Sequence, residues 1–422
     1  ALFIAATLLL PITAWGQKFE PNYDESKIPA FTLPDPLVTE GGKPVSDVKT
    51  WTDVRRPEIL KLFEQQVYGR GPAPCSIEAR LISTQGDAVD GKAVRREVDV
   101  FFGKADQAPA MRLLIYTPKS IDKAPAFLGL NFNGNHTVDA DPTISRNRNW
   151  VRDRDGVTKD HRSLESSRGM ASSRWPIELI IDRGYALVTI YYGDIDPDFD
   201  DGFENGIHGH FASETESIAL GQRWGSIAAW AYGLSRAVDY LQTDDHIDAS
   251  RVAVIGHSRL GKTSLWAGAS DPRFKMVISN NSGCGGAALS RRAIGETVGR
   301  INTSFPHWFC DNFLQYNENE NACPVDQHQL ISLIAPRAVY VASATEDRWA
   351  DPKGEFLAAV GADPVYRLLG TGGLGGDSPP EMPAADQPIK TGQIGYHLRT
   401  GKHDVTSYDW TQYLNFADRH LR

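Results

Sequence analysis

The chain has no long basic run and few positive charges for its length. Lysine and arginine together number 44 against 53 aspartates and glutamates, which gives a formal net charge of −9 at pH 7. A protein whose main partner is nucleic acid or an anionic membrane needs clustered cations to meet the phosphate groups. The composition therefore predicts no nucleic acid partner and, for the mature chain, no membrane partner.

Long apolar runs are also scarce, and the clearest one is too short to span a bilayer. Residues 1–13 (ALFIAATLLLPIT) are nearly all apolar, whereas a spanning helix needs roughly 20 such residues. Ala14 and Gly16 precede Gln17 as small residues do at a signal-peptidase site. Because no initiator methionine or basic segment precedes the run, we expect residues 1–16 to be a signal peptide truncated at its start. This predicts a secreted or periplasmic protein. The alternative interpretations of the apolar run are a membrane anchor and a buried helix.

Only four cysteines occur: Cys75, Cys284, Cys310 and Cys323. An even number in an exported chain permits one or two disulfides among three possible pairings. Three of the four fall within one polar segment, where we expect at least one bridge. Free buried thiols are the alternative.

Metal-binding patterns are weak. No His, Cys and Asp spacing matches a zinc site. The segment DIDPDFDDGFEN at 194–205 has aspartates at the first, third and fifth positions of a calcium loop. However, Phe199 stands where that loop requires glycine, and Asn205 where it requires glutamate. We therefore interpret it as an ordinary acidic loop and predict neither a metal nor a cofactor.

Apolar, strand-like runs recur along the rest of the chain, and the later ones are nearly all apolar, as strands covered on both faces are. An amphipathic helical pattern at 225–242 separates two of these runs, and this alternation indicates a mostly parallel sheet with helices on both faces. Residues 17–422 are predicted to form a single α/β catalytic domain that starts with an extended arm over about 17–50. The strand-like runs lie at 96–102, 111–118, 126–134, 185–193, 252–258, 276–283 and 338–347.

Three segments do not fit this alternation. Residues 135–175 are polar and rich in Arg and Asp, 284–330 carry aromatic residues and three cysteines, and 371–394 are dense in Gly and Pro. Long loops in a compact domain are usually functional or mobile. We expect these insertions to form the walls of a binding site.

The stretch VAVIGHSRLGKT at 252–263 runs from an apolar strand into a serine and then a plausible helix. The usual nucleophile elbow of α/β-hydrolases reads G-x-S-x-G, with small residues two positions either side of the serine. Gly256 fits, but Leu260 occupies the second small position and the glycine comes one residue late, at Gly261. The strand, turn and helix context favours Ser258 as a nucleophile over a plain helix cap and predicts an α/β-hydrolase fold with long loop insertions around the active site.

A hydrolytic serine needs a base, which follows the acid in the order of α/β-hydrolases. The histidines after Ser258 include His307, His328 and His420, the last of which we expect to be solvated. His403 is favoured because it stands in a Gly-punctuated loop directly before the final amphipathic helix. Its neighbour His397 is interpreted as structural.

The acid is expected to follow a strand. The run AVYVASATED ends in Glu346 and Asp347, where a carboxylate could orient the imidazole. The strand after the elbow ends instead in Asn280, Asn281 and Ser282, none of which ionises. The acid is therefore expected at 346 or 347.

Two cations accompany the elbow. Lys262 lies four residues after Ser258, on the same helix face, and Arg259 could supply its backbone N–H, and its guanidinium as well, to an oxyanion hole. Positive charges in the first turn of a helix are mildly unfavourable. Their presence here therefore indicates a functional role for the two cations. The alternative is that both cations simply face solvent.

Together, GHSRLGKTSLWAG, NNSGCGGAALSRRAIGET, SATEDRWADPKGEF and GKHDVTSYDW resemble the glucuronoyl esterases of carbohydrate esterase family fifteen, especially bacterial members, over most of the mature chain. In that family the elbow reads G-x-S-R-x-G-K, so the late Gly261 is that pattern's own spelling. The resemblance implies that Ser258 is the nucleophile, His403 the base and Arg259 part of the oxyanion hole. It also implies sugar-binding roles for Lys262, Glu296 and Trp349, the last as a wall of the site.

This chain departs from the fungal pattern at the acid. Fungal members have glutamate directly before S-G-x-G-G, and this chain has Asn281 there. It resembles bacterial members that use a carboxylate after the later strand, which we assign to Asp347, with Glu346 as the fallback.

The implied substrate is the ester between 4-O-methyl-glucuronic acid on glucuronoxylan and a lignin alcohol. Cations at the elbow suit an acyl group that is itself a sugar acid, because the reacting carbonyl then lies beside them. We expect a monomer that works by acyl transfer to Ser258. An acetyl xylan esterase or general carboxylesterase on the same fold is the alternative, and a non-catalytic carbohydrate-binding protein is a further one.

Overall fold

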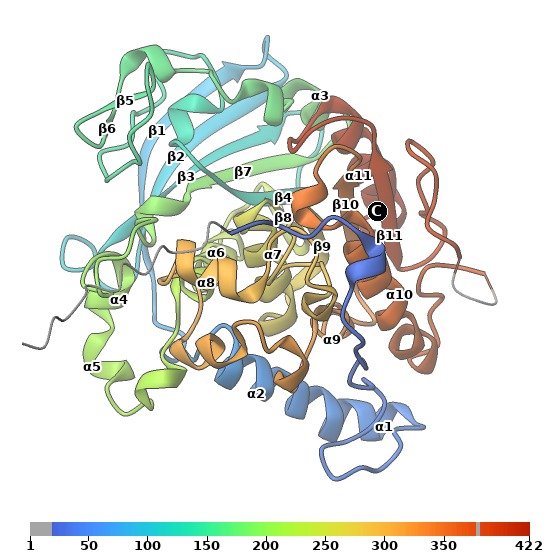
Figure 1. The fold of residues 1–422 in the computed structure, drawn as a ribbon. Helices are drawn as coiled ribbons and strands as arrows, with labels where there is room; N and C mark the ends of the chain where they lie inside the picture. Colours follow the sequence, from blue (N-terminus) through green and yellow to red (C-terminus); the bar gives the residue numbers. More distant parts are fainter. Residues whose placement is uncertain (1–18, 377–379) are drawn as a thin grey trace, which may run out of the picture.

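The structure, a computed structural model, describes residues 19–376 and 380–422 (Figure 1). The predicted signal peptide at 1–16 lies outside the described residues. Within the described ranges, no helix is both long and apolar enough to cross a membrane.

In the described residues, nine strands form one sheet in the order β1-β2-β3-β7-β4-β8-β9-β10-β11. Neighbours are antiparallel from β1 to β7 and parallel from β7 to β11. This topology confirms the prediction of a mostly parallel α/β-hydrolase sheet. The strands of the chain are β1 (Glu78–Ala88), β2 (Ala93–Phe101), β3 (Ala110–Pro118), β4 (Ala124–Asn131), β5 (Thr158–Lys159), β6 (Arg162–Ser163), β7 (Ala186–Tyr191), β8 (Ile247–His257), β9 (Phe274–Asn280), β10 (Ala338–Ala344) and β11 (Ile394–Arg399).

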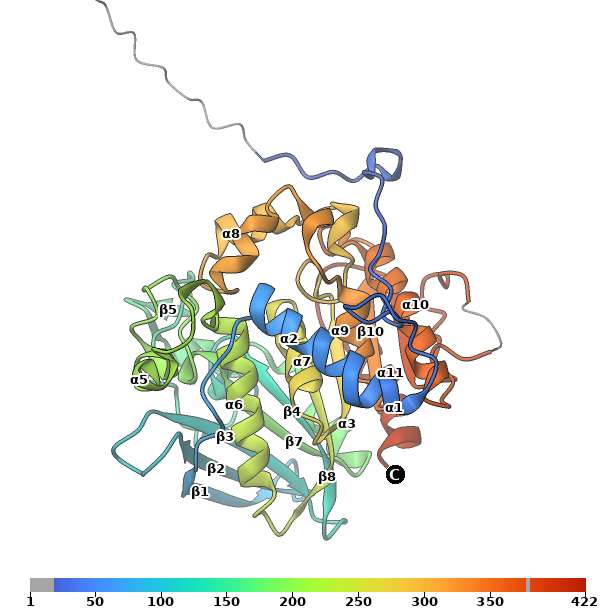
Figure 2. The same ribbon diagram turned by 90° about the horizontal axis from the view of Figure 1, so that it is seen from below.

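Helices cover both faces of the sheet (Figures 1 and 2). Residues of α2, α6, α7, α9 and α10 pack in one hydrophobic cluster with one face, and residues of α3 and α11 pack in a second cluster on the other. The α-helices are α1 (Val48–Thr50), α2 (Arg56–Gln66), α3 (Ile177–Asp182), α4 (Gly206–His210), α5 (Ala212–Thr215), α6 (Ser226–Leu241), α7 (Arg259–Ser270), α8 (Val298–Ser304), α9 (Gln327–Ser332), α10 (Pro352–Leu368) and α11 (Ser407–His420).

Alternation along the central strands explains why those strands are apolar throughout. Val252 and Val254 of β8 belong to the first cluster, whereas Ala253 and Ile255 belong to the second. Successive side chains of a strand point to opposite faces, and here each face lies under helices. Both faces therefore need apolar residues.

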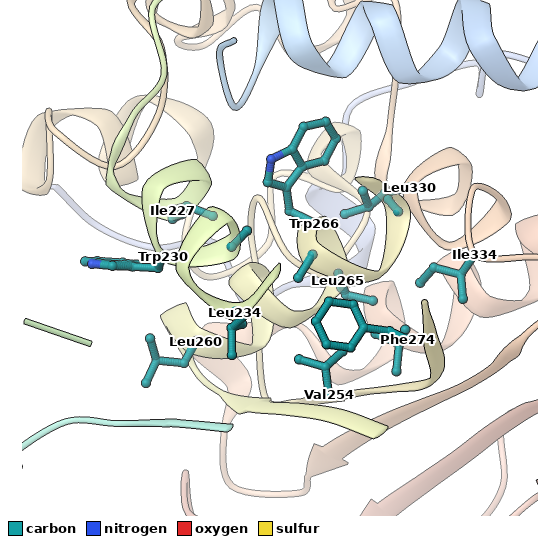
Figure 3. Close-up of a cluster of buried hydrophobic side chains, with 14 of the residues drawn as sticks. Ile227, Trp230, Leu234, Val254, Leu260, Leu265, Trp266, Phe274, Leu330 and Ile334 are labelled. Atoms are coloured by element: carbon teal, nitrogen blue, oxygen red, sulfur yellow. The ribbon is translucent and has the colours of Figure 1, made fainter. Parts of the chain in front are cut away.

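The cluster between α6, α7 and the sheet positions the elbow (Figure 3). Leu234 of α6, Leu260 and Leu265 of α7 and Phe274 of β9 are all buried there. Helix α2 packs on the outer side of α7, where the Phe63 ring lies 6.4 Å from the ring of Trp266. Helix α7 is thus fixed on several sides, and with it the turn that begins it.

Strands β1 and β11 were not expected from the sequence. Most side chains of β1 are exposed, so the strand has no apolar run to reveal it. Strand β11 begins at the end of the Gly- and Pro-rich segment, which masks its short apolar pattern. It pairs in parallel with β10 and leads directly to the loop that carries His403.

The expectation of a disulfide is wrong. All four cysteines lie in the described residues and all are free. Burial raises the pKa of the Cys310 and Cys323 thiols to about 12, and the sulfur of Cys310 faces the carbonyl oxygen of Gln65 at 3.9 Å. The cysteine-containing segment is held by its buried aromatic side chains, such as Phe309 and Phe313, which need no covalent bridge.

When the protein is unfolded in denaturant without reductant, four thiols per chain should therefore become accessible to titration. In the native state we expect only Cys75 to react with a thiol reagent, because it is the only one of the four that is not buried. Titration with a chromogenic disulfide reagent measures both values. Two or fewer thiols in denaturant would instead show that a bridge exists.

Candidate active site

Ser258 stands on a sharp turn between β8 and α7. Its backbone has φ of 58° and ψ of −128°, a region that is strained for a residue with a side chain. A Cβ at Gly256 would lie 1.8 Å from the carbonyl oxygen of Leu260, and a Cβ at Gly261 would lie 2.9 Å from the Cβ of Ser282. The late glycine is thus needed where α7 passes the end of β9, while Leu260 points into the core.

The strand next to the elbow holds this turn in place. The Ser258 N–H donates to the carbonyl oxygen of Asn280 at 2.9 Å. The side-chain oxygen of Asn280 lies 2.6 Å from His257 Nδ1, and the ring centroid of His257 is 4.4 Å from that of His403. Burial, together with the neighbouring His403, holds the pKa of His257 well below its usual range. His257 therefore stays neutral and links the elbow to the histidine loop.

Of the two candidate acids, the structure brings Asp347 to His403. The distance from Asp347 Oδ2 to His403 Nδ1 is 2.6 Å, and the carboxylate is buried. Glu346 is exposed, and its backbone N–H donates to the carbonyl oxygen of Gly401. In the described residues no hydrogen bond joins Ser258 Oγ to His403, whose ring is 41% exposed. Such contacts often tighten only when substrate is bound.

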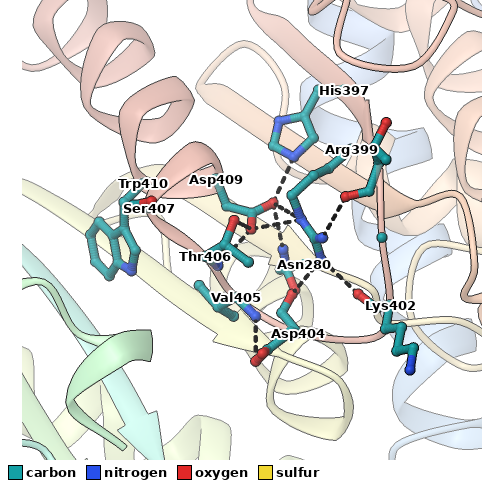
Figure 4. Close-up of polar contacts among 12 residues, drawn as sticks. Asn280, His397, Arg399, Lys402, Asp404, Val405, Thr406, Ser407, Asp409 and Trp410 are labelled. Carbon is teal, nitrogen blue, oxygen red and sulfur yellow. Dashed lines mark hydrogen bonds and ion pairs between the residues drawn. The ribbon is translucent and has the colours of Figure 1, made fainter.

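A buried polar cluster shapes the loop that carries His403 (Figure 4). The guanidinium of Arg399 donates to the carbonyl oxygens of Thr400, Lys402 and Asp404 at 2.9, 2.7 and 3.1 Å. It also pairs with the buried carboxylate of Asp409 at 3.0 Å. One side chain thereby fixes three carbonyl groups of this loop, two before His403 and one after it.

His397 belongs to this same cluster. Its Nε2 lies 2.9 Å from Asp409 Oδ1 and its Nδ1 lies 3.1 Å from the hydroxyl of Tyr340. The side chain is fully buried, and both ring nitrogens have partners. This environment agrees with the structural role expected from the sequence.

Arg259 is enclosed beside Ser258. Its guanidinium pairs with Asp198 and lies 4.8 Å from the ring centroid of Trp308 and 5.6 Å from that of Phe305. Asp198 is buried and also accepts hydrogen bonds from His307 at 3.0 Å and Trp308 at 2.7 Å. Burial opposes ionisation of Asp198, but the hydrogen bond from His307 and the charge of Arg259 outweigh it and hold its pKa below the usual range.

Sequence reasoning missed Asp198, although it lies within the acidic loop that was set aside as a calcium site. Two of its partners are far away along the chain, Arg259 by 61 residues and His307 by 109. The sequence held one indication of this contact. Arg259 has no acidic neighbour in the sequence, and a buried arginine needs a carboxylate from another part of the chain.

Lys262 does not face solvent either. Its Nζ donates to the carbonyl oxygens of Ser282 and Cys284 at 2.5 and 2.6 Å, and lies 3.4 Å from Glu296 Oε2. An ammonium group has three donors, and all three are directed at these acceptors. Lys262 therefore ties the loop after β9 to Glu296.

Trp349 and Glu296 lie side by side near the protein surface, at what we call the rim of the site. The Glu296 N–H donates to the carbonyl oxygen of Trp349 at 3.0 Å. The indole of Trp349 is 36% exposed, and its ring centroid is 6.0 Å from that of Phe19, in the arm. The structure thus brings together the three residues for which sugar binding is expected.

One buried carboxyl group near the site was not foreseen. Glu355 is fully buried, and its Oε1 accepts the N–H groups of Ser282 and Gly283 at 2.8 and 3.0 Å. Its Oε2 lies 2.6 Å from the hydroxyl of Ser343 at the end of β10. Burial, with a contribution from Asp347, raises the pKa of Glu355 to about 8. At neutral pH it is mostly protonated and holds the ends of β9 and β10 together without adding charge.

Comparison with known proteins gives a consistent result. A family profile described as "Glucuronyl esterase, fungi" matches residues 218–370. "Carbohydrate esterase MZ0003", from an unknown prokaryotic organism, is 55% identical over 406 residues, which cover 95% of this chain and 92% of that relative. "4-O-methyl-glucuronoyl methylesterase 1" of Phanerochaete chrysosporium is 36% identical over 155 residues, 34% of this chain and 33% of that relative.

Solved structures extend the similarity to the fold. A promiscuous CE15 esterase from the marine bacterial metagenome superposes with a TM-score of 0.88 at 53% identity, covering 95% of this chain and 100% of that one. The glucuronoyl esterase from Solibacter usitatus gives a TM-score of 0.87 at 48% identity, covering 94% and 100%. The catalytic domain from Hypocrea jecorina, at 20% identity and a TM-score of 0.64, covers 96% and 91% and shares the fold.

Substitution of Glu355 by Gln should change how stability depends on pH. The folded-state pKa of Glu355, about 8, lies above the usual 4.5. The protonated group therefore contributes its full stabilisation below about pH 4.5, and this contribution is lost as the pH rises through 8. Over that range the free energy of unfolding falls by ~1.4 kcal/mol per pH unit at most. Gln copies the protonated form, so the Tm of Glu355→Gln relative to wild type should rise from pH 5 to pH 8.5 in calorimetry.

Glu346→Gln is the matched control, because this carboxylate is exposed. Its Tm difference from wild type should stay constant over the same pH range. A constant difference for Glu355→Gln as well would contradict the assigned pKa.

Proposed function

Since this chain belongs to the glucuronoyl esterases of carbohydrate esterase family 15, we propose that it is a serine esterase acting on 4-O-methyl-glucuronoyl esters that link glucuronoxylan to lignin alcohols. The observation that carries the proposal is one constellation: Ser258 on a strained elbow, His403 with its ring 4.4 Å from that of the adjacent His257 and Asp347 at 2.6 Å, and Arg259 at the start of α7. Each of these groups has a distinct task in acyl transfer.

In the first step, Ser258 Oγ attacks the carbonyl carbon of the uronic ester and His403 Nε2 takes its proton. Asp347 keeps Nδ1 protonated and stabilises the imidazolium that forms. As the ester C–O bond breaks, His403 gives the proton to the departing alcohol. The product of this step is a uronoyl ester of Ser258.

In the second step, water attacks this acyl-enzyme while His403 takes its proton, and the same proton returns to Ser258 Oγ as the acyl bond breaks. The uronic acid then leaves as a carboxylate. Both tetrahedral intermediates carry an oxyanion at the start of α7, where the first amides lack acceptors within the helix and the helix dipole is positive. The guanidinium of Arg259 adds a fixed positive charge that Asp198 holds in position.

The acyl side of the ester is proposed to be the sugar acid. Glu296 and Trp349 line the rim next to the loop that Lys262 holds. Because Lys262 already has three acceptors, we assign the main hydrogen bonds with sugar hydroxyls to Glu296 and the flat contact to Trp349. The relatives named 4-O-methyl-glucuronoyl methylesterases support the same acyl group.

The finer properties are proposals of the same kind. We propose secretion or periplasmic location from the apolar N-terminal run, a monomer, and a lignin alcohol as the leaving group. A preference for acetyl esters is the alternative. It is less favoured because an acetyl ester would leave Glu296 and Trp349 without a sugar on the acyl side.

Hydrolysis of benzyl glucuronate, benzyl galacturonate and acetylated xylan separates these functions. We expect release of benzyl alcohol from the glucuronate by wild type and a loss of about 10³-fold or more in kcat for Ser258→Ala, which removes the nucleophile. Chromatography of the products measures each rate. Release of acetate with no cleavage of the uronates would refute the uronate assignment.

The acid assignment has its own comparison. Asp347→Ala should lower kcat on benzyl glucuronate by about 10³- to 10⁴-fold, because His403 loses the partner that sets its tautomer. Glu346→Ala is the matched neighbour and should stay within about twofold of wild type, since surface changes away from such contacts have small effects. Near-full activity of Asp347→Ala with a large loss in Glu346→Ala would transfer the role to Glu346.

A further inference from the structure

A polar hollow lies along the 135–175 insertion, away from the residues assigned above. One part has a volume of about 210 Å³ and is lined by Asn147, Asn149, Asp194 and Arg112 among others. An adjoining part of about 440 Å³ shares Asn149 and Asp194 and adds the aromatic side chains of Trp150 and Phe199. We call the two parts the insertion groove, defined by Asn147, Asn149, Trp150, Asp194 and Phe199.

The floor of the groove offers hydrogen-bonding groups with free capacity. Asp194 accepts from Asn149 Nδ2 at 2.6 Å and from the Arg112 N–H at 3.2 Å, whereas a carboxylate can accept about four hydrogen bonds. The Nδ2 of Asn147 is buried and has no acceptor within the described residues. Burial raises the pKa of Asp194 to about 6, so the group is still mainly ionised at neutral pH.

An aromatic platform adjoins these groups. The ring centroids of Trp150 and Phe199 are 4.6 Å apart, and His161 stacks on Trp150 at 5.2 Å. The Trp150 carbonyl oxygen accepts from the hydroxyl of Tyr191 at 2.6 Å, which fixes the backbone of the platform. Trp150 and Phe199 remain half-buried, so ring surface is left for a ligand.

One side of the groove lies next to the residues that hold Arg259. Phe199 directly follows Asp198, the partner of Arg259. Arg152, two residues after Trp150, donates to the carbonyl oxygen of Asp198 at 3.0 Å and lies 5.9 Å from the ring centroid of Phe305. One acidic residue thus joins the platform to the arginine beside the elbow.

We propose that the insertion groove binds neutral sugar residues of the xylan main chain that carries the ester. The inference rests on the proposed function for its substrate, but the groove itself stands on its own contacts. The C–H face of a pyranose packs on an indole, and its hydroxyls donate to a carboxylate and accept from amides. This combination of an aromatic surface with a few fixed polar groups is what Trp150, Asp194 and Asn149 supply.

At the floor of the groove, Asp194 disfavours an anionic sugar. The guanidinium of Arg112 is engaged by Asp99 through two hydrogen bonds of 2.7 and 2.8 Å. Asp194 at the floor would repel a carboxylate brought next to it. Arg146, Arg148 and Arg162 line the groove from exposed positions, so an anionic oligosaccharide is the appropriate competing probe.

Direct binding tests the groove apart from catalysis. Xylohexaose and a galacturonate hexamer are titrated by calorimetry into Ser258→Ala and into Ser258→Ala carrying Trp150→Ala. We expect xylohexaose to bind the first protein and to lose about tenfold in affinity on the second. Ser258→Ala carrying Trp150→Phe should recover most of the affinity. Binding of the galacturonate alone, or of neither probe, would overturn the proposal.

Kinetics give a second readout on the active chain. Trp150→Ala and Asn149→Ala should raise KM for polymeric glucuronoxylan esters by about 5- to 10-fold, while kcat/KM for benzyl glucuronate stays within twofold. Because Asn149 is exposed, its variant should fold even if Trp150→Ala does not. Equal losses on both substrates would refute a main-chain groove, whereas no cleavage of benzyl glucuronate by wild type would refute the proposed function instead.

Discussion

The backbone of Ser258 has φ of 58° and ψ of −128°, a conformation that costs on the order of 1–3 kcal/mol for a residue with a side chain. Such a turn persists only where its surroundings determine it. Gly256 lets the chain approach Leu260, Leu260 anchors the new helix in the core, and Asn280 accepts the Ser258 N–H. The position of the half-buried serine is therefore a consequence of apolar packing between α7, α6 and the sheet.

Charges near this turn occur as complete pairs. Arg259 lies against Asp198, and Lys262 has two carbonyl oxygens and Glu296. Removing one partner of a buried pair typically costs 3–5 kcal/mol, because the remaining charge is left unpaired. The same low polarity that makes such a loss costly strengthens the attraction between a fixed cation and a developing oxyanion. Stability and reactivity thus depend on the same contacts.

The sequence predicted the parts of the fold that rest on local pattern. The apolar run before Ser258 correctly predicts β8, and the helical period at 225–242 correctly predicts α6. In both cases burial determines which positions must be apolar. Sequence reasoning could not find the contact of Asp198 with Arg259 or that of Glu355 with Gly283, which join residues 61 and 72 positions apart. Cysteine number misled because the aromatic core of that segment already supplies the stability that a bridge would add.

The proposed place of the catalytic acid agrees with how the loop after β9 is used. Glu355 holds the N–H groups of Ser282 and Gly283, and Lys262 holds the carbonyl oxygen of Ser282. Asn281 has φ of 47°, which asparagine tolerates well, and its buried amide has no partner among the described residues. An ionised carboxylate at 281 would add charge to a region where Asp347 already raises the pKa of Glu355. With the β9 loop engaged in this way, it is the carboxylate after β10, that of Asp347, that meets His403 at 2.6 Å.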